Sequence, residues 1–83
     1  MDAKIKYLAQ LVNHLLAQES PKAMEKALND LLSSSELTDV ANRLQIFAML
    51  EQGIPQRQIA DKLGVGIATV TRGSNALKKR EGY

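Results

Sequence analysis

Apolar residues recur along the first third of the chain at the three- and four-residue spacing of one helix face. One such stripe lies within about Asp2–Gln18 and consists of Ile5, Leu8, Leu11, Val12, Leu15 and Leu16. A second stripe follows Ser20 and Pro21, which are typical of the N-cap and the first position of a helix. Its members are Met24, Ala27, Leu28, Leu31 and Leu32. The pattern predicts two amphipathic helices.

A third helix is predicted to begin behind a capping box formed by Ser33 and Glu36, and to run to about Gln52, before Gly53. Its apolar residues cover most of its circumference, as in a central helix: Leu37, Val40, Ala41, Leu44, Ile46, Phe47, Ala48, Met49 and Leu50. A chain of 83 residues can enclose little around such a helix. Residues 1–53 are therefore predicted to form the helical dimerisation core of a homodimer.

Two short amphipathic helices with a tight turn between them are predicted over residues 54–83. The first begins at Gln56, and Gly64 ends it in a left-handed conformation that costs glycine nothing. Gly66 is the expected N-cap of the second helix. The small Ala60 and the apolar turn residue Val65 lie at the spacing of a helix-turn-helix core. The other predicted members of this core are Ile59, Leu63 and Val70. This arrangement is typical of a unit whose second helix enters the DNA major groove.

The charge is distributed unevenly along the chain. The formal net charge is +2 at pH 7, and residues 54–83 alone carry a net +4, with six Lys or Arg against two acidic residues. Residues 1–35 are neutral, and residues 36–53 have a net charge of −2. A basic last third favours contact with DNA phosphates. The alternative to a DNA-binding helix-turn-helix is a plain helical hairpin, and the alternative to a phosphate-binding surface is a solvated basic tail.

Composition argues against an enzyme and a metal site. The chain has no Cys, and His14 is its only His, so no pair of such ligands can form. No Gly-rich phosphate loop is present. With 45% apolar residues the chain is a single folded all-α domain rather than a disordered one. Neither a signal peptide nor an apolar run of membrane-spanning length occurs, so a cytoplasmic protein is expected.

The segment GIATVTRGSNALK, residues 66–78, resembles the signature of the tryptophan repressor family. The resemblance extends back through residues 55–64 and, more weakly, through residues 31–46. It implies a bacterial transcriptional repressor that is an intertwined all-helical homodimer. It also implies L-tryptophan as the corepressor ligand, no other cofactor, and a palindromic DNA operator before tryptophan-related genes.

The resemblance also implies a ligand site. Arg43 and Arg72 would sandwich the indole ring, since a planar cation is attracted to the face of an aromatic ring. Arg72 would also pair with the ligand carboxylate. The Ser33 hydroxyl would lie near that carboxylate, and backbone around Leu32 and Asp30 would lie near the ligand ammonium group. Gly73 would leave room beside the ring, and Phe47 would line the pocket.

For DNA, the resemblance assigns Arg57 to the edge of a guanine, which Arg reads with two hydrogen bonds. Water-mediated base contacts, for which Trp repressors are the standard example, would come from Ile67, Ala68, Thr69 and Thr71. Phosphate contacts would come from Gln56, Asn75 and Lys78. Arg72 is a further expected DNA-binding residue, shared with the ligand site.

Three positions depart from the family pattern. Ala76 replaces a Ser that helps to hold the ligand ammonium group, and Phe47 replaces a smaller aliphatic residue. The chain ends at Tyr83, where the family typically has one more helix packed into the dimer core. A second function therefore stays open beside the tryptophan-gated repressor: a ligand-independent helix-turn-helix module that binds DNA or protein.

Overall fold

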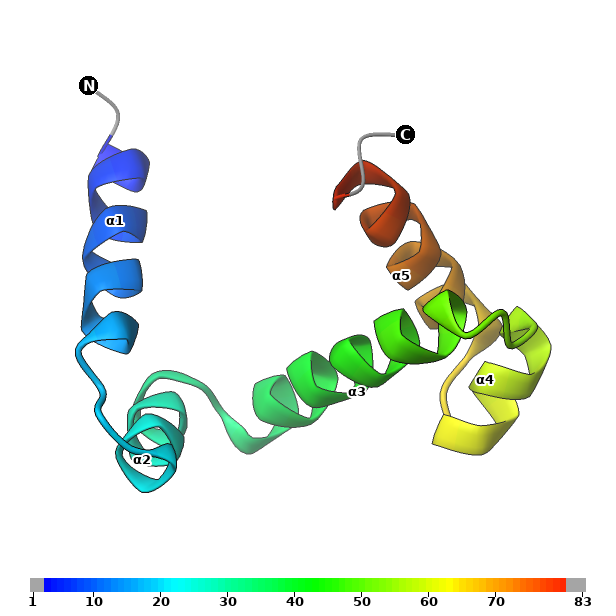
Figure 1. Cartoon of the computed structure of the whole chain (residues 1–83), viewed down its shortest axis with the longest axis horizontal. Helices are drawn as coiled ribbons and strands as arrows, with labels where there is room; N and C mark the ends of the chain where they lie inside the picture. The colour runs from blue at the N-terminus through cyan, green and yellow to red at the C-terminus, as the bar shows by residue number, and fades with distance from the viewer. Residues whose placement is uncertain (1–2, 81–83) are drawn as a thin grey trace. The chain divides into compact units, whose positions relative to one another are not determined.

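The computed structural model describes residues 3–80, and this part of the chain contains five α-helices and no strand (Figure 1). The all-α fold is therefore confirmed. The chain divides between Leu37 and Thr38 into two compact units. The helices are α1 (Ala3–Leu16), α2 (Pro21–Leu31), α3 (Ser34–Glu51), α4 (Gln56–Leu63) and α5 (Ile67–Arg80).

The first unit contains α1, α2 and the first turn of α3. Ser20 is the N-cap of α2, since its hydroxyl accepts a 3.0 Å hydrogen bond from the backbone N–H of Ala23, and Pro21 follows at the first helical position. Helix α1 ends two residues earlier than predicted, at Leu16, and Asp2 lies outside the described residues. Ala27 is the one residue of α2 that is buried.

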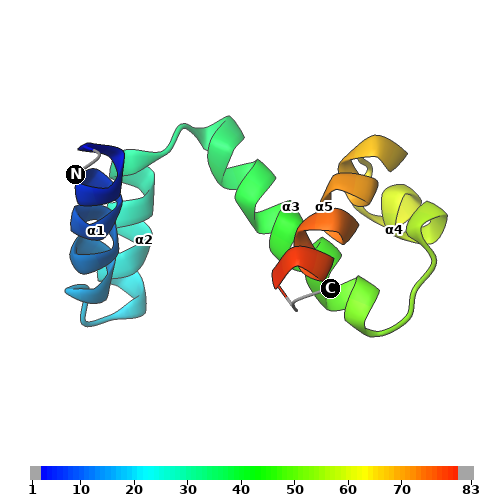
Figure 2. The ribbon, with the colours of Figure 1, turned by 90° about the horizontal axis from the view of Figure 1, so that it is seen from above.

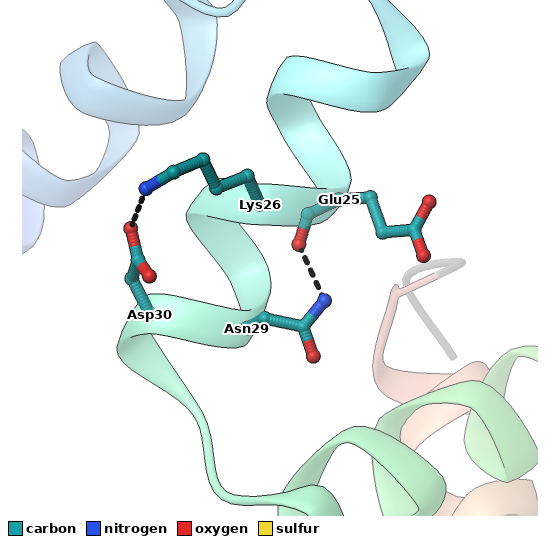
Figure 3. Close-up of polar contacts among 4 residues, drawn as sticks. All are labelled: Glu25, Lys26, Asn29 and Asp30. Carbon is teal, nitrogen blue, oxygen red and sulfur yellow. Dashed lines mark hydrogen bonds and ion pairs between the residues drawn. The ribbon is translucent and has the colours of Figure 1, made fainter.

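Charged and amide side chains on α2 bond along the helix rather than across it. Lys26 Nζ lies 3.0 Å from Asp30 Oδ2, and Asn29 Nδ2 donates a 2.9 Å hydrogen bond to the carbonyl of Glu25 (Figure 3). The side chains of the ion pair are 78% and 62% exposed, so solvent screens it strongly. We interpret these contacts as the solvated face of an amphipathic helix.

The predicted capping box at the start of α3 is confirmed. Glu36 Oε1 accepts a 2.8 Å hydrogen bond from the backbone N–H of Ser33, and Ser33 Oγ accepts a 3.1 Å bond from the backbone N–H of Glu36. The pKa of Glu36 is lowered, first by the hydrogen bond from the Ser33 backbone N–H to its carboxylate and then by a hydrogen bond from the Ser33 hydroxyl. Two reciprocal hydrogen bonds between Ser33 and Glu36 thus fix the start of α3.

In the second unit, α4 and α5 pack together beside the last turns of α3 (Figure 2). The turn between them is as predicted: Gly64 adopts the left-handed conformation with φ 67°, and the carbonyl of Gly66 accepts the first hydrogen bonds of α5. The buried core of this unit joins all three helices and consists of Ile46, Ile59, Ala60 and Val70. The helix-turn-helix is therefore anchored on α3.

Gly73 brings α5 and α3 into close contact. A Cβ atom built at this buried position would lie 2.6 Å from Cγ2 of Ile46, a distance that real Cβ atoms do not show. Ile46 is fully buried, so a shift of its side chain would disturb the core around it. Glycine is therefore required here for the crossing of the two helices.

Helix α3 is apolar around most of its circumference, and the single chain covers little of it. Ile46 is its one buried residue, whereas the side chains of Val40 and Leu44 are 55% and 64% exposed in the single chain. Helix α1 likewise has no buried residue, and Leu8 and Leu16 are among its exposed apolar side chains. Two helices thus present apolar faces that this chain alone leaves uncovered.

Candidate nucleic-acid interface and ligand pocket

Helix α5 presents most of the predicted DNA-contacting residues to solvent. Ile67 is 50% exposed, and Ala68, Thr71, Asn75 and Lys78 are exposed as well. The opposite side of the helix is buried through Val70, Gly73, Ser74 and Leu77. The 3.6-residue period therefore separates a packing side from a side that is free to meet DNA.

The start of α4 is connected to α5 by a hydrogen bond. Thr71 Oγ1 lies 3.0 Å from Gln56 Oε1 and 3.1 Å from the carbonyl oxygen of Ile67. Arg57, the predicted guanine reader, is exposed next to Gln56. Residues predicted to contact phosphate and bases thus lie on neighbouring ends of the two helices.

The last turn of α5 is basic, with Lys78, Lys79 and Arg80. Arg80 is held by α3: its Nη2 atom lies 3.0 Å from Glu51 Oε1, and its guanidinium carbon lies 5.2 Å from the centre of the Phe47 ring. Positive charge at a helix C-terminus is favourable. Arg80 therefore contributes to fixing α5 on α3, in addition to any contact with DNA.

A pocket of about 330 Å³ lies between α3 and the helix-turn-helix. Helix α3 contributes Asp39, Asn42, Arg43 and Ile46; the turn contributes Val65; and α5 contributes Thr69 and Arg72. The two arginines expected to hold the ligand ring therefore line the same pocket. Apolar surface from Ile46 and Val65 lies beside them, as a flat aromatic ligand requires.

Arg72 is oriented by its own helix. Its Nη2 atom donates a 3.3 Å hydrogen bond to Thr69 Oγ1, one turn earlier. Thr69, one of the predicted base-contacting residues, is half-buried and lines the pocket. The recognition helix and the pocket thus share two neighbouring side chains.

The other predicted ligand residues have different surroundings. Gly73 faces Ile46, and the Phe47 ring lies under the guanidinium of Arg80. Leu32 and Ser33 belong to the first unit, where Leu32 is the C-cap of α2 and Ser33 caps α3. Their ligand roles stay predictions.

Asp39 and Asn42 were missed by the sequence reasoning. Asp39 precedes Arg43 by four residues and Asn42 precedes Ile46 by four, so each pair lies on one face of α3. Given Arg43 as a site residue, this spacing indicates that Asp39 lies on the same face of the helix. Within residues 3–80, no cluster of His, Asp or Glu could hold a metal ion, and no helix has the length and apolar character to cross a membrane.

Residues 6–83 match the model of a family described as Trp repressor protein. A Trp operon repressor homolog of Chlamydia trachomatis serovar D is 58% identical over 59 residues, which are 65% of this chain and 63% of that protein. A homolog of the same name from Vibrio cholerae is 45% identical over 71 residues, 84% of this chain and 66% of the relative. The chain thus spans slightly less than two thirds of these relatives. No solved structure matches it.

Proposed function

The chain belongs to the Trp repressor family, and we propose that it is a sequence-specific DNA-binding transcriptional repressor with L-tryptophan as corepressor. It would act in the bacterial cytoplasm, at operators of tryptophan-related genes. The proposal rests on the family and on one observation: Arg43 of α3 and Arg72 of α5 line one pocket beside the helix-turn-helix.

This pocket supports a gating mechanism. An indole ring between the two guanidinium groups is attracted by both, most strongly where water is excluded. Because Arg72 belongs to α5, a bound ring would restrain the recognition helix relative to α3. The ligand would then raise DNA affinity only to the extent that it binds the restrained orientation of α5 more tightly than the other orientations.

The proposed active species is a homodimer in which residues 1–53 form the dimerisation core and residues 54–83 the DNA-binding unit. The exposed apolar residues Val40 and Leu44 on α3 and Leu8 on α1 support this proposal, since a second chain would cover them. For consecutive major grooves, the two copies of α5 would lie about 34 Å apart.

On DNA, Arg57 would read a guanine, and α5 would face the groove through Ile67, Ala68, Thr69 and Thr71. Gln56, Asn75 and Lys78 would contact phosphates. Each of these side chains except half-buried Gln56 and Thr69 is exposed. These roles follow the family resemblance, and the exposure of α5 supports them.

Two observations favour the alternative, a ligand-independent helix-turn-helix module. The core of Ile46, Ile59, Ala60 and Val70 already joins α3, α4 and α5 without a ligand. Exposed Ala76 also carries no hydroxyl for a ligand ammonium group. In this alternative α5 is held in position by packing alone, and tryptophan would have no effect on DNA binding.

The test is DNA binding with and without L-tryptophan, on duplexes that the protein itself selects from a random pool. We expect Arg57→Ala to cost about 1–3 kcal/mol and to relax the preference for one base. Lys78→Ala should weaken binding to all sequences alike and reduce the salt dependence by about one phosphate contact. Tryptophan-independent binding would favour the alternative, and the absence of any selected sequence would refute both readings.

A further inference from the structure

The guanidinium group of Arg80, in the last turn of α5, contacts two side chains of α3 at once. Its Nη2 atom lies 3.0 Å from Glu51 Oε1, and its central carbon lies 5.2 Å from the centre of the Phe47 ring. Phe47 and Glu51 are four residues apart, on one face of α3. A planar guanidinium can stack on a ring and pair with a carboxylate together, which an ammonium group does less well. These three residues thus join the two helices, and we call them the Arg80 clamp.

The Arg80 clamp contributes little to the free energy of unfolding. The side chains of its ion pair are 53% and 51% exposed, so solvent screens their attraction. Unlike the pair of Lys26 with Asp30, which lies within α2, this pair joins residues that are 29 positions apart in the chain. Its main effect is therefore on how α5 is placed on α3.

The place of the clamp along α5 suits it to fix the orientation of that helix. Helix α5 crosses α3 where Gly73 contacts Ile46, and Arg80 lies seven residues later, about 10 Å along the helix axis. A contact at that distance from the crossing point resists rotation of α5 more than a contact at the crossing itself. Exposed Ala68 and Thr71, which are expected to face DNA, lie on the other side of the crossing. Any rotation that the clamp prevents would displace them.

We propose that Arg80 is a positioning residue for DNA binding, which acts through Phe47 and Glu51 and holds α5 in the orientation that the groove requires before a ligand binds. The inference rests on the proposed function, in which α5 is the recognition helix and a ring between Arg43 and Arg72 restrains it. The clamp and the ring restrain the same rotation from different points of α5. The clamp therefore sets how much of the DNA affinity depends on the ligand.

The test measures the DNA affinity with and without saturating L-tryptophan, on a duplex that the unmodified chain selects. The ratio of the two affinities is the tryptophan enhancement. Arg80→Met removes the charge and keeps the stem of the side chain, and Glu51→Gln weakens only the ion pair. Lys79→Met is the matched control, since it removes the same charge from the exposed neighbouring position. A change in net charge alters both affinities alike and cancels in the ratio, and circular dichroism verifies that each variant is folded.

We expect Arg80→Met to lower the DNA affinity more without L-tryptophan than with it. The tryptophan enhancement should rise by about fivefold, the upper size for an exposed ion pair. Glu51→Gln keeps the contact with the Phe47 ring and should raise the enhancement by a smaller factor, and Lys79→Met should leave it unchanged. An unchanged enhancement in Arg80→Met would overturn the positioning role, and equal losses with and without tryptophan would mean that Arg80 acts as a positive charge alone.

A failure of the proposed function would give a different result. If L-tryptophan has no effect on DNA binding by the unmodified chain, the gating mechanism is wrong, and a double-mutant cycle of Arg80→Met with Glu51→Gln in DNA affinity decides the role of the clamp. Coupled effects would support the clamp, and additive effects would overturn it. If the unmodified chain selects no DNA sequence, the proposed function is wrong and this inference falls with it.

Discussion

The Thr71 hydroxyl on α5 lies within hydrogen-bonding distance of two acceptors, Gln56 Oε1 at 3.0 Å and the carbonyl oxygen of Ile67 at 3.1 Å. A hydroxyl has one proton, so it donates fully to only one of them at a time. When it donates to Gln56, the amide oxygen is engaged and the amide NH₂ remains free to donate to a phosphate. When it donates to Ile67, nothing holds the amide in that orientation.

We therefore predict that Thr71, besides facing the groove, supports DNA binding by orienting Gln56. Thr71→Val keeps the shape of the side chain and removes the hydroxyl, and it should weaken DNA binding by about 1 kcal/mol, the net value of one hydrogen bond. In a Gln56→Ala background, the same substitution should have a smaller effect, because only the direct contribution of Thr71 at the groove remains. The measurement is a double-mutant cycle of DNA affinity at fixed salt. Fully additive losses would contradict the prediction and would indicate that Thr71 contacts DNA by itself.

The close approach of Gly73 and Ile46 predicts the effect of one methyl group. Alanine is the better helix former by about 1 kcal/mol, but its Cβ would lie 2.6 Å from Cγ2 of the fully buried Ile46, so the core would have to shift. Overpacking of this kind costs about 1–3 kcal/mol. Gly73→Ala should therefore destabilise the protein in chemical denaturation.

The matched control for Gly73 is Gly66→Ser. Gly66 has open space around its Cβ position and lies before the first residue of α5, where Ser is a preferred N-cap. We expect this variant to be as stable as the unmodified chain or more so. A Gly73→Ala protein that is equally stable would mean that α3 and α5 are not packed as described.

The helices and their ends could be predicted from the sequence because the forces that fix them are local. Ser20, the pair Ser33 and Glu36, and Gly64 act on backbone within four residues of themselves, so spacing alone identifies them. The core of the helix-turn-helix followed from the same periodicity. All of these predictions are confirmed.

The pocket could be predicted only in part, because its wall depends on how α3 and α5 cross. The pairing of Arg43 with Arg72 came from the family resemblance, not from spacing. Asp39 became visible only once both helices were placed. The contact of Gly73 with Ile46 likewise depends on this crossing, and the place of Gly73 beside a ligand ring stays a prediction. The hydrophobic periodicity of a helix predicts which of its faces is apolar, but it does not predict which atoms of two helices come into contact.

The capping box at Ser33 predicts a dependence of stability on pH. The pKa of Glu36 is lowered in the folded chain from its ordinary value of 4.5 by hydrogen bonds from Ser33. A lowered folded pKa stabilises the native state above the unfolded pKa, and this contribution is lost as the pH falls through the folded value. The stability difference between the unmodified chain and Glu36→Gln should thus be constant from pH 7 to about pH 5 and should shrink below the ordinary value.

The measurement is urea denaturation of both proteins from pH 7 down to pH 3. Protonated Glu and Gln have the same charge and the same hydrogen-bonding oxygen, so the two curves should converge in acid. A difference that stays constant down to pH 3, or that grows, would contradict the capping contribution of the carboxylate.

The exposed apolar side of α3 predicts self-association. Leu44 is 64% exposed in the single chain, so Leu44→Glu should leave the fold of one chain intact and should break a dimer that buries this residue. Sedimentation at micromolar concentration should show a dimer for the unmodified chain and a monomer for the variant. Gln45→Glu, which adds the same charge at the exposed neighbouring position, should remain dimeric. A monomeric unmodified chain would contradict the dimer.

The most direct test of tryptophan gating is reciprocity. If L-tryptophan raises DNA affinity by some factor, saturating DNA must raise tryptophan affinity by the same factor. The chain contains no Trp, so the emission of bound tryptophan can be followed against a background of two Tyr. L-tryptophan is titrated into the protein alone and into its complex with a selected duplex. We predict a lower dissociation constant in the complex, by the factor found for DNA; equal dissociation constants in the two titrations would contradict the gating mechanism.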